Sequence, residues 1–236
     1  MRKIIYDGIY VHLLHLNELI DLSDVEIVGG GFDCKQNHLT SLKGSPFKCS
    51  GFVDCSENKL TSLKYAPETD GSFFCGVNLL NSLEYAPEVS TDFICYKNLL
   101  KDLEHAPHTV NGTFRCNHNL LISLKGAPKF TKHNFMCYSN QLTNLEYSPK
   151  IANRSFNCAN NKLESLEGAP EYVGAVNPGR FGISSYFDCS MNPLTSLDGI
   201  PKRVDGDFVI SKELMDIFPE KYIRSRCAIA GDIEYL

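Results

Sequence analysis

Apolar residues recur along the chain in one short pattern that is repeated many times. Each unit has an aromatic or aliphatic residue, a cysteine two positions later, and leucines five and eight positions after that cysteine. An asparagine follows three positions after the cysteine, and a proline follows twelve positions after it. Around the cysteine, inward and outward positions alternate as they do in a β-strand. The pattern predicts one short strand per unit, a turn at the asparagine, and two core leucines before an extended return.

Eight units fit this template, with a period of 20 or 21 residues except between the last two cysteines. The unit cysteines are Cys34, Cys55, Cys75, Cys95, Cys116, Cys137, Cys158 and Cys189. The unit asparagines are Asn37, Asn58, Asn78, Asn98, Asn119, Asn140, Asn161 and Asn192. A fixed period of this length indicates a solenoid. We therefore expect parallel strands in register, with a ladder of cysteines in the core and a ladder of asparagines at the turns.

The motif F-x-C-x-x-N-x-L-x-x-L resembles the leucine-rich repeat L-x-L-x-x-N-x-L, with Phe and Cys where Leu usually stands. The resemblance covers roughly residues 11–218. The short period resembles the shortest bacterial class of these repeats, and the wording S-L-x-x-A-P resembles repeat proteins of bacteria and their phages. The resemblance implies a repeat solenoid with a curved parallel β-sheet on the concave face and an irregular, proline-containing convex side. It also implies a binding scaffold, which is an analogy from the fold alone.

We expect a single domain over residues 1–236, because each unit of a solenoid contacts only its neighbours. A degenerate N-terminal cap should span residues 1–31, the eight units residues 32–207, and a C-terminal cap residues 208–236. Ten extra residues interrupt the period near Val173, so residues 174–186 should form an inserted surface loop. Such an insertion either contacts a partner or is a tolerated decoration.

The N-terminal cap reads as a degenerate repeat, with Leu14 in the cysteine slot followed by Asn17, Leu19 and Leu22. The stretch before it, residues 4–11, favours a strand or a hairpin.

At the other end, residues 208–210 should form a last strand with Ile210 in the cysteine slot. Pro219 and Glu220 at the start of residues 219–226, with basic residues at the end, favour a short helix. Residues 232–236 should add a tail strand or pack over the cap.

The return of each unit contains an Ala-Pro or similar pair, which disfavours a helix. Small aliphatic residues follow and are expected to close the core from behind. They are Val89, Val110, Ile151, Val173 and Val204.

The ten cysteines are expected to be reduced. Eight occupy one core position, and in-register side chains on parallel strands point the same way, which suits a disulfide poorly. Metal-ligand spacings such as C-x-x-C are absent from the sequence. Cys49 and Cys227 lie outside the ladder, so they are the candidates for exposed, reactive thiols.

Net charge of −5 and an isoelectric point near 5.8 argue against a general binder of nucleic acid or anionic membranes. The sequence has no apolar run long enough for a membrane span, and its start lacks the apolar core of a signal peptide. We expect a cytoplasmic protein, in the host cytoplasm if a phage encodes it.

Motifs for hydrolysis, phosphate binding or zinc catalysis do not occur, and none of the seven histidines recurs with a partner acid. We therefore expect no enzyme, no catalytic residues, no metal site and no cofactor.

Side chains at outward positions of the sheet do not pack in the core. The types of residue found there can therefore indicate whether the sheet binds a partner. In the end units these positions are acidic or small, whereas in the middle units they are apolar, aromatic and basic, as in interface hot spots. The expected partner-binding residues, with two from the insertion, are Phe74, Ile94, Tyr96, Lys97, Arg115, His118, Met136, Tyr138, Arg180 and Phe181.

The sequence therefore predicts a non-enzymatic protein-binding module, and a phage setting would imply an antagonist of a host protein. Two alternatives stay open. The basic and aromatic set could sequester a small anionic ligand such as a nucleotide. The array could also be a structural or assembly component. The identity of the partner and the oligomeric state are left open as well.

Overall fold

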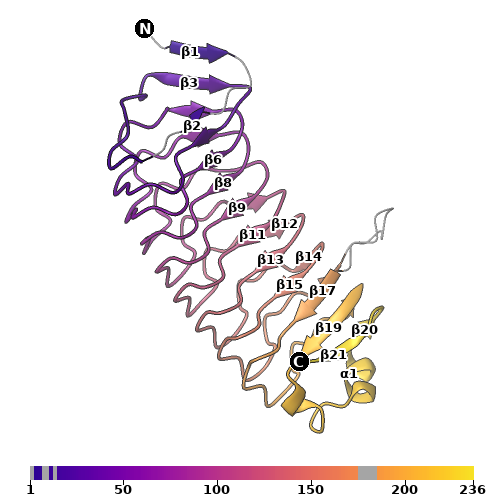
Figure 1. Ribbon diagram of the computed structural model, residues 1–236. Coiled ribbons are helices and arrows are strands. Elements are labelled where there is room, and N and C mark those ends of the chain that lie inside the picture. The colour runs from indigo at the N-terminus through magenta and orange to yellow at the C-terminus, as the bar shows by residue number, and fades with distance from the viewer. Residues whose placement is uncertain (1–2, 7–10, 13–14, 175–184) are drawn as a thin grey trace.

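The computed structural model describes residues 3–6, 11–12, 15–174 and 185–236. The chain winds into a parallel β-solenoid whose turns stack from β1 to the C-terminal helix α1 (Figure 1). One strand of each turn joins a long sheet, here called the main sheet, and the return of the turn runs behind it. Neighbouring strands pair in parallel, with the same template position opposite itself, as in Phe93 opposite Phe114.

Within the described residues, the main sheet has eleven strands, and most are only two residues long. In spatial order they are β2 (Val11–His12), β4 (Phe32–Asp33), β6 (Val53–Asp54), β8 (Phe73–Phe74), β9 (Phe93–Ile94), β11 (Phe114–Arg115), β13 (Phe135–Met136), β15 (Phe156–Asn157), β17 (Ser185–Asp188), β19 (Gly206–Ile210) and β21 (Ile233–Tyr235).

The returns are more regular than expected, because many of them form short parallel strands of their own. Four such strands form one sheet, in the order β1 (Lys3–Tyr6), β3 (Val25–Val28), β5 (Lys48–Cys49) and β7 (Glu68–Thr69). Six form another, in the order β10 (Thr109–Val110), β12 (Phe130–Thr131), β14 (Ile151–Ala152), β16 (Tyr172–Val173), β18 (Arg203–Val204) and β20 (Ala228–Ile229).

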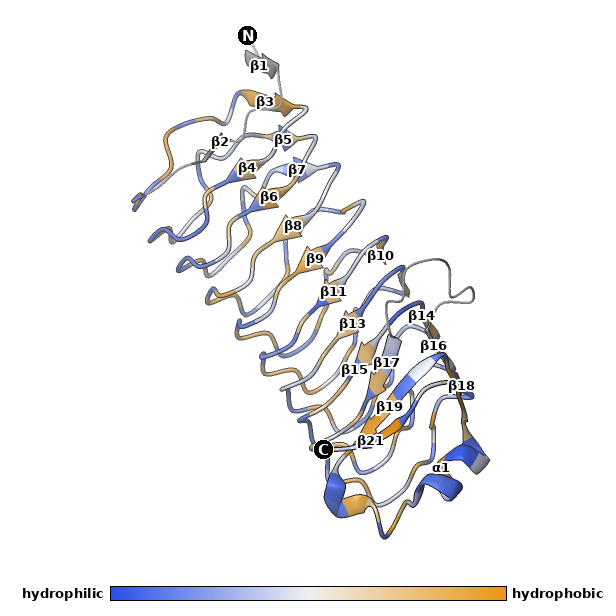
Figure 2. Ribbon diagram, turned by 45° about the vertical axis from the view of Figure 1, so that its right-hand side comes forward, coloured by the Kyte–Doolittle hydropathy of each residue, from blue (hydrophilic) through white to orange (hydrophobic). Residues whose placement is uncertain are grey.

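A continuous stack of phenylalanine rings fills the core between the two sides. Neighbouring rings from Phe73 to Phe208 lie 5.3–5.9 Å apart between centroids. The unit cysteines and both leucines of each unit are buried beside this stack, as predicted. Figure 2 shows the same division in colour, with hydrophobic residues along the main-sheet strands and hydrophilic residues in many of the outer turns.

The asparagine ladder joins each turn to the one before it. Asn98, for example, donates from Nδ2 to the carbonyl oxygens of Cys75 (3.0 Å) and Cys95 (3.1 Å). Its Oδ1 accepts from the N–H of Leu80 at 3.0 Å. The same bonds recur along the ladder, which confirms that the asparagines satisfy backbone groups in adjacent units.

Three expectations for buried and exposed positions are wrong, at Ile151, Cys49 and Cys227. Ile151 is 40% exposed, and its neighbour Ala152 fills the core instead, because Ala152 pairs in register with Thr131 and Val173. Cys49 is also buried rather than exposed, because β5 places it in the return layer of the core.

Cys227 was likewise expected to be exposed and is 2% exposed. It directly follows α1 (Glu220–Arg226), the short helix predicted for this region, after the 3₁₀ helix η1 (Lys212–Leu214). The tail forms a strand, since β21 pairs with β19, so residues 208–210 are not the last strand of the sheet. In the described part of the chain, no helix has the length and apolar character required to cross a membrane.

The N-terminal cap differs from the expected register. β1 pairs with β3 and β2 pairs with β4, so residues 4–11 contribute strands to two sheets and not a hairpin. The N–H of Leu16 donates to Asn37 Oδ1 (2.7 Å), as Leu39 does to Asn58 one turn later, so Leu16 stands where Leu19 was expected. Asn17 is exposed, and the expected position of Leu14 falls outside the described residues.

Candidate functional site

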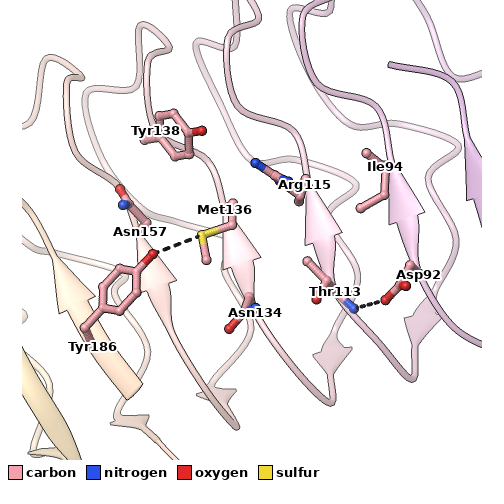
Figure 3. Close-up of a pocket in the computed structure, with 9 residues that line it drawn as sticks. All are labelled: Asp92, Ile94, Thr113, Arg115, Asn134, Met136, Tyr138, Asn157 and Tyr186. Carbon is pink, nitrogen blue, oxygen red and sulfur yellow. Dashed lines mark hydrogen bonds between the residues drawn. The ribbon is translucent and has the colours of Figure 1, made fainter. Parts of the chain in front are cut away.

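A hollow of about 550 Å³ lies on the outward face of the main sheet, across the central units (Figure 3). It spans strands β9 to β17. Its lining residues are Asp92, Ile94, Thr113, Arg115, Asn134, Met136, Tyr138, Asn157 and Tyr186. In Figure 3, Tyr138, Arg115 and Ile94 stand toward the C-terminal ends of the strands, whereas Asp92, Thr113 and Asn134 stand toward their beginnings.

Arg115 is held against an aromatic ring. Its guanidinium carbon lies 5.6 Å from the centroid of the Tyr96 ring, within the range of a cation–π contact. Tyr96 in turn covers Gly76, because a Cβ built on Gly76 would approach that ring to 2.5 Å. Glycine one turn earlier therefore allows the tyrosine to lie where it can contact Arg115.

Two polar side chains at the middle of this face lack hydrogen bonds within the described residues. The Nε of Arg115 is buried and unpartnered. Asn117, two residues further along the same face, is fully buried, and both its Oδ1 and its Nδ2 are unpartnered. A buried polar group without a hydrogen-bond partner lowers the stability of the fold by about 1–3 kcal/mol. Two such groups on one face therefore mark this unit as a candidate site for an external partner.

Aromatic contacts shape the walls of the hollow. Tyr186 lies across from Met136, with its hydroxyl 3.9 Å from Sδ, and Figure 3 shows the two side chains facing each other. Tyr138 meets the ring of His118 edge-on, with centroids 5.2 Å apart.

The opposite end of the hollow is polar. Asp92 accepts from the N–H of Thr113 through Oδ1 (2.7 Å), and Asn134 accepts from the N–H of Ser155 (3.2 Å). These hydrogen bonds hold the loops that lead into the strands. Asp92 is the acidic residue among those that line the hollow.

Positive charge on this face is not neutralised by ion pairs within the described residues. Among the described residues, neither Lys97 nor Arg115 has a carboxylate within ion-pairing distance. In the first units, by contrast, Lys35 lies between Asp33 (3.6 Å) and Asp54 (3.7 Å). The central face is therefore basic on a chain whose overall charge is −5.

The hollow brings together four of the ten predicted residues, namely Ile94, Arg115, Met136 and Tyr138. Two more, Tyr96 and His118, contact its walls. Phe74 packs instead against Phe52 in an edge arrangement (6.2 Å), and Lys97 is exposed two residues beyond Cys95.

The insertion lies mostly outside the described residues. Arg180 and Phe181 are among those positions, so their predicted contact with a partner stays a prediction.

The sequence analysis did not identify the residues of the hollow that lie at the beginning of the strands. Asp92, Thr113, Asn134 and Tyr186 all stand three positions before a unit cysteine, and they share the outward direction of the residue one before it. Counting only the positions next to the cysteine overlooked them.

It also missed an apolar ridge of three exposed leucines, Leu79, Leu99 and Leu120, in consecutive units. They are 46%, 44% and 38% exposed. Each stands four positions after a unit cysteine, directly before a buried leucine, where the flanking units have Lys59 and Gln141. The signal that could have revealed this ridge is the pair of adjacent leucines that each of these three units contains.

The site offers no chemistry for a metal or a reactive thiol. No group of three or more histidine, cysteine, aspartate or glutamate side chains in the described residues is placed to hold a metal ion. Burial raises the pKa of the Cys49 and Cys227 thiols to about 12, so both stay protonated at neutral pH.

Comparison with known proteins informs the fold. No protein-family model and no curated protein matches the sequence. The chain is similar in structure to YopM from Yersinia enterocolitica WA-314, with a TM-score of 0.53 and 18% sequence identity. The match covers 85% of this chain and 49% of YopM, so the chain spans about half the length of that protein. The fold is a parallel β-solenoid of the leucine-rich-repeat type.

Proposed function

We propose that the chain is a non-enzymatic binding module that holds a protein partner on the central units of its main sheet. One observation carries the proposal: apolar, aromatic and unpaired basic side chains gather over consecutive strands around an open hollow. Aromatic residues and arginine are enriched at the centres of protein interfaces, and exposed apolar patches usually mark interaction sites.

The rest of the molecule supports a preformed platform. Stacked phenylalanines and the asparagine ladder fix every turn against its neighbours, so little ordering of the sheet is required when a partner binds. A binding surface of this kind spans several units and suits a macromolecule better than a small ligand.

The setting that we propose is cytoplasmic. The S-L-x-x-A-P wording resembles repeat proteins of bacteria and their phages, and in a phage setting the partner would be a host protein that the module antagonises. Arg180 and Phe181 of the insertion would extend the contact surface beyond the sheet.

A capture experiment tests the proposal. Wild-type protein immobilised on beads should retain one defined protein from a lysate of the host cell. Arg115→Ala combined with Tyr138→Ala should lose it, because both side chains line the hollow. The matched control is Lys129→Ala with Tyr147→Ala, another cation–π pair (5.9 Å) that lies outside the hollow.

Retention of the same protein by the hollow variant would contradict the proposal. Two other outcomes would favour the remaining interpretations. Stabilisation by several degrees on addition of nucleotides at low concentration would favour a small-ligand binder. Self-association in solution without any captured partner would favour an assembly component.

A further inference from the structure

We propose that the hollow receives the carboxylate of an aspartate or glutamate side chain from an extended segment of the protein partner, and that Arg115 binds it. Apolar side chains of the same segment would lie on the ridge formed by Leu79, Leu99 and Leu120. The inference rests on the proposed function and adds the chemistry of the partner: an acidic segment with apolar residues beside the acid.

Arg115 is placed to bind an acceptor that the described part of the chain does not supply. Its Nε is buried without a hydrogen bond in the described structure, and the Tyr96 ring at 5.6 Å limits where the guanidinium lies. A guanidinium has only donors, in a planar fork that matches the two oxygens of a carboxylate. Leaving a buried charged donor unpaired is costly, so a carboxylate that reaches it gains more than one bound at an exposed lysine.

Charge around the hollow favours an acidic ligand. Lys97 lies in the unit before that of Arg115 and does not pair with an acid within the described residues, and His118 follows Arg115 by three residues in the same unit. Asp92 is the acidic lining residue, but its Oδ1 is already bonded to the N–H of Thr113. Positive potential at the centre of an acidic chain would select a partner segment of opposite charge and steer its approach.

The leucine ridge indicates that the carboxylate belongs to a protein segment. Leu99 and Leu120 follow Lys97 and His118 by two residues in the chain, and both leucines are exposed. A free small anion would use the cations but leave three exposed leucines uncovered. An extended peptide with alternating acidic and apolar side chains can cover both.

Selection from a random peptide display library on the full-length protein tests the inference. We expect the recovered peptides to share one Asp or Glu with apolar neighbours. Arg115→Gln should weaken their binding about tenfold or more, which is the usual size of a charge-assisted hydrogen bond. Changing the shared acid to its amide should weaken binding equally, and combining the two changes should cost little more than either alone.

Two further variants keep the test decisive. Arg115→Lys retains the positive charge but lacks the planar guanidinium that donates two hydrogen bonds to one carboxylate. Its affinity should therefore lie between those of Arg115→Gln and wild type. Lys129→Gln is the matched control, because Lys129 also lies over a tyrosine ring but outside the hollow, and its binding should equal wild type. Melting curves should show that each variant is folded.

The outcomes separate this inference from the proposed function. Peptides that lack a shared acid, or that bind Arg115→Gln as tightly as wild type while losing affinity for Tyr138→Ser, would overturn the inference and leave the proposed function standing. Peptides that bind both variants normally, or a selection that recovers none, would overturn both.

Discussion

Each unit cysteine serves the fold in two ways at once. Its side chain is buried in the core, and several of the thiols also donate to a main-sheet carbonyl of the next turn, as Cys158 Sγ does to Asp188 O (3.3 Å). A leucine in this slot would fill space but could not donate. The cysteine ladder therefore couples neighbouring turns as well as packing between them.

Substitutions at Cys116 test this role. Cys116→Asp should unfold the array, because it buries a charge with no partner among apolar side chains. Cys116→Ala should cost only about 1–2 kcal/mol, because it leaves a small cavity. Chemical denaturation monitored by circular dichroism distinguishes the two.

Reducing agent is the control for that experiment. All ten cysteines are free in the structure, so dithiothreitol should change neither the fold nor the melting temperature. A clear drop in melting temperature under reduction would contradict the assignment of free thiols.

At the scale of elements, β17 shows how the array absorbs its irregular unit. β17 pairs with β15 in the usual register, with Phe156 opposite Phe187, although 31 positions separate them. β17 is also four residues long where β15 has two, and it includes Tyr186, which lines the hollow from the template position that Asp92 and Thr113 occupy in earlier units. The core template therefore continues unchanged on both sides of the insertion.

Deleting residues 175–184 tests the insertion. Because the deletion restores the spacing of the other units and leaves the Phe156–Phe187 pairing available, we expect the melting temperature to stay within a few degrees of wild type. Loss of Arg180 and Phe181 should speed dissociation of the partner, measurable by surface plasmon resonance. Unchanged dissociation would mean that the insertion is a decoration and that the sheet alone makes the contact.

The strands, the two ladders and the C-terminal helix could be predicted because each template position has one fixed environment. Ile151 and Cys49 were misplaced for one reason. The return slot that faces the core lies six positions before the cysteine, which is where Ala152 and Cys49 stand. Choosing the larger aliphatic residue of the return instead of counting that spacing gave the wrong position.

The hollow was only partly predictable. Its apolar and basic residues follow from composition at outward positions. Its shape also depends on side-chain directions, such as those of Tyr186 and Met136, which face each other across it. Side-chain directions cannot be read from a period in the sequence.

For the whole molecule, ten buried thiols predict sensitivity to alkali. Burial raises the pKa of every cysteine, from 9.0 to about 12 for Cys49 and Cys227 and further for the ladder cysteines. Below pH 9 the thiols are protonated in both folded and unfolded chains, so they add no pH dependence. Above it the unfolded chain releases protons that the folded chain retains, and stability falls.

The expected result is cooperative unfolding at about pH 10. Each thiol lowers the free energy of unfolding by about 1.4 kcal/mol per pH unit above its ordinary pKa. Ten together therefore lower it by about 14 kcal/mol one unit above that pKa, close to the top of the roughly 5–15 kcal/mol range of a typical domain. Far-ultraviolet circular dichroism and iodoacetamide labelling, followed together across the titration, should change in one step. Labelling at neutral pH without loss of structure would contradict the burial of the thiols.

The stacking of strands along one axis also has a mechanical consequence. Backbone hydrogen bonds between neighbouring turns run along the stack, from β1 at one end to β21 at the other (Figure 1). Force applied to the two ends would break the hydrogen bonds between one pair of neighbouring turns before those of the next pair. The solenoid would therefore unfold turn by turn at low force. A partner bound across several central turns would hold those turns together. Binding would then limit how far the molecule can be extended by force.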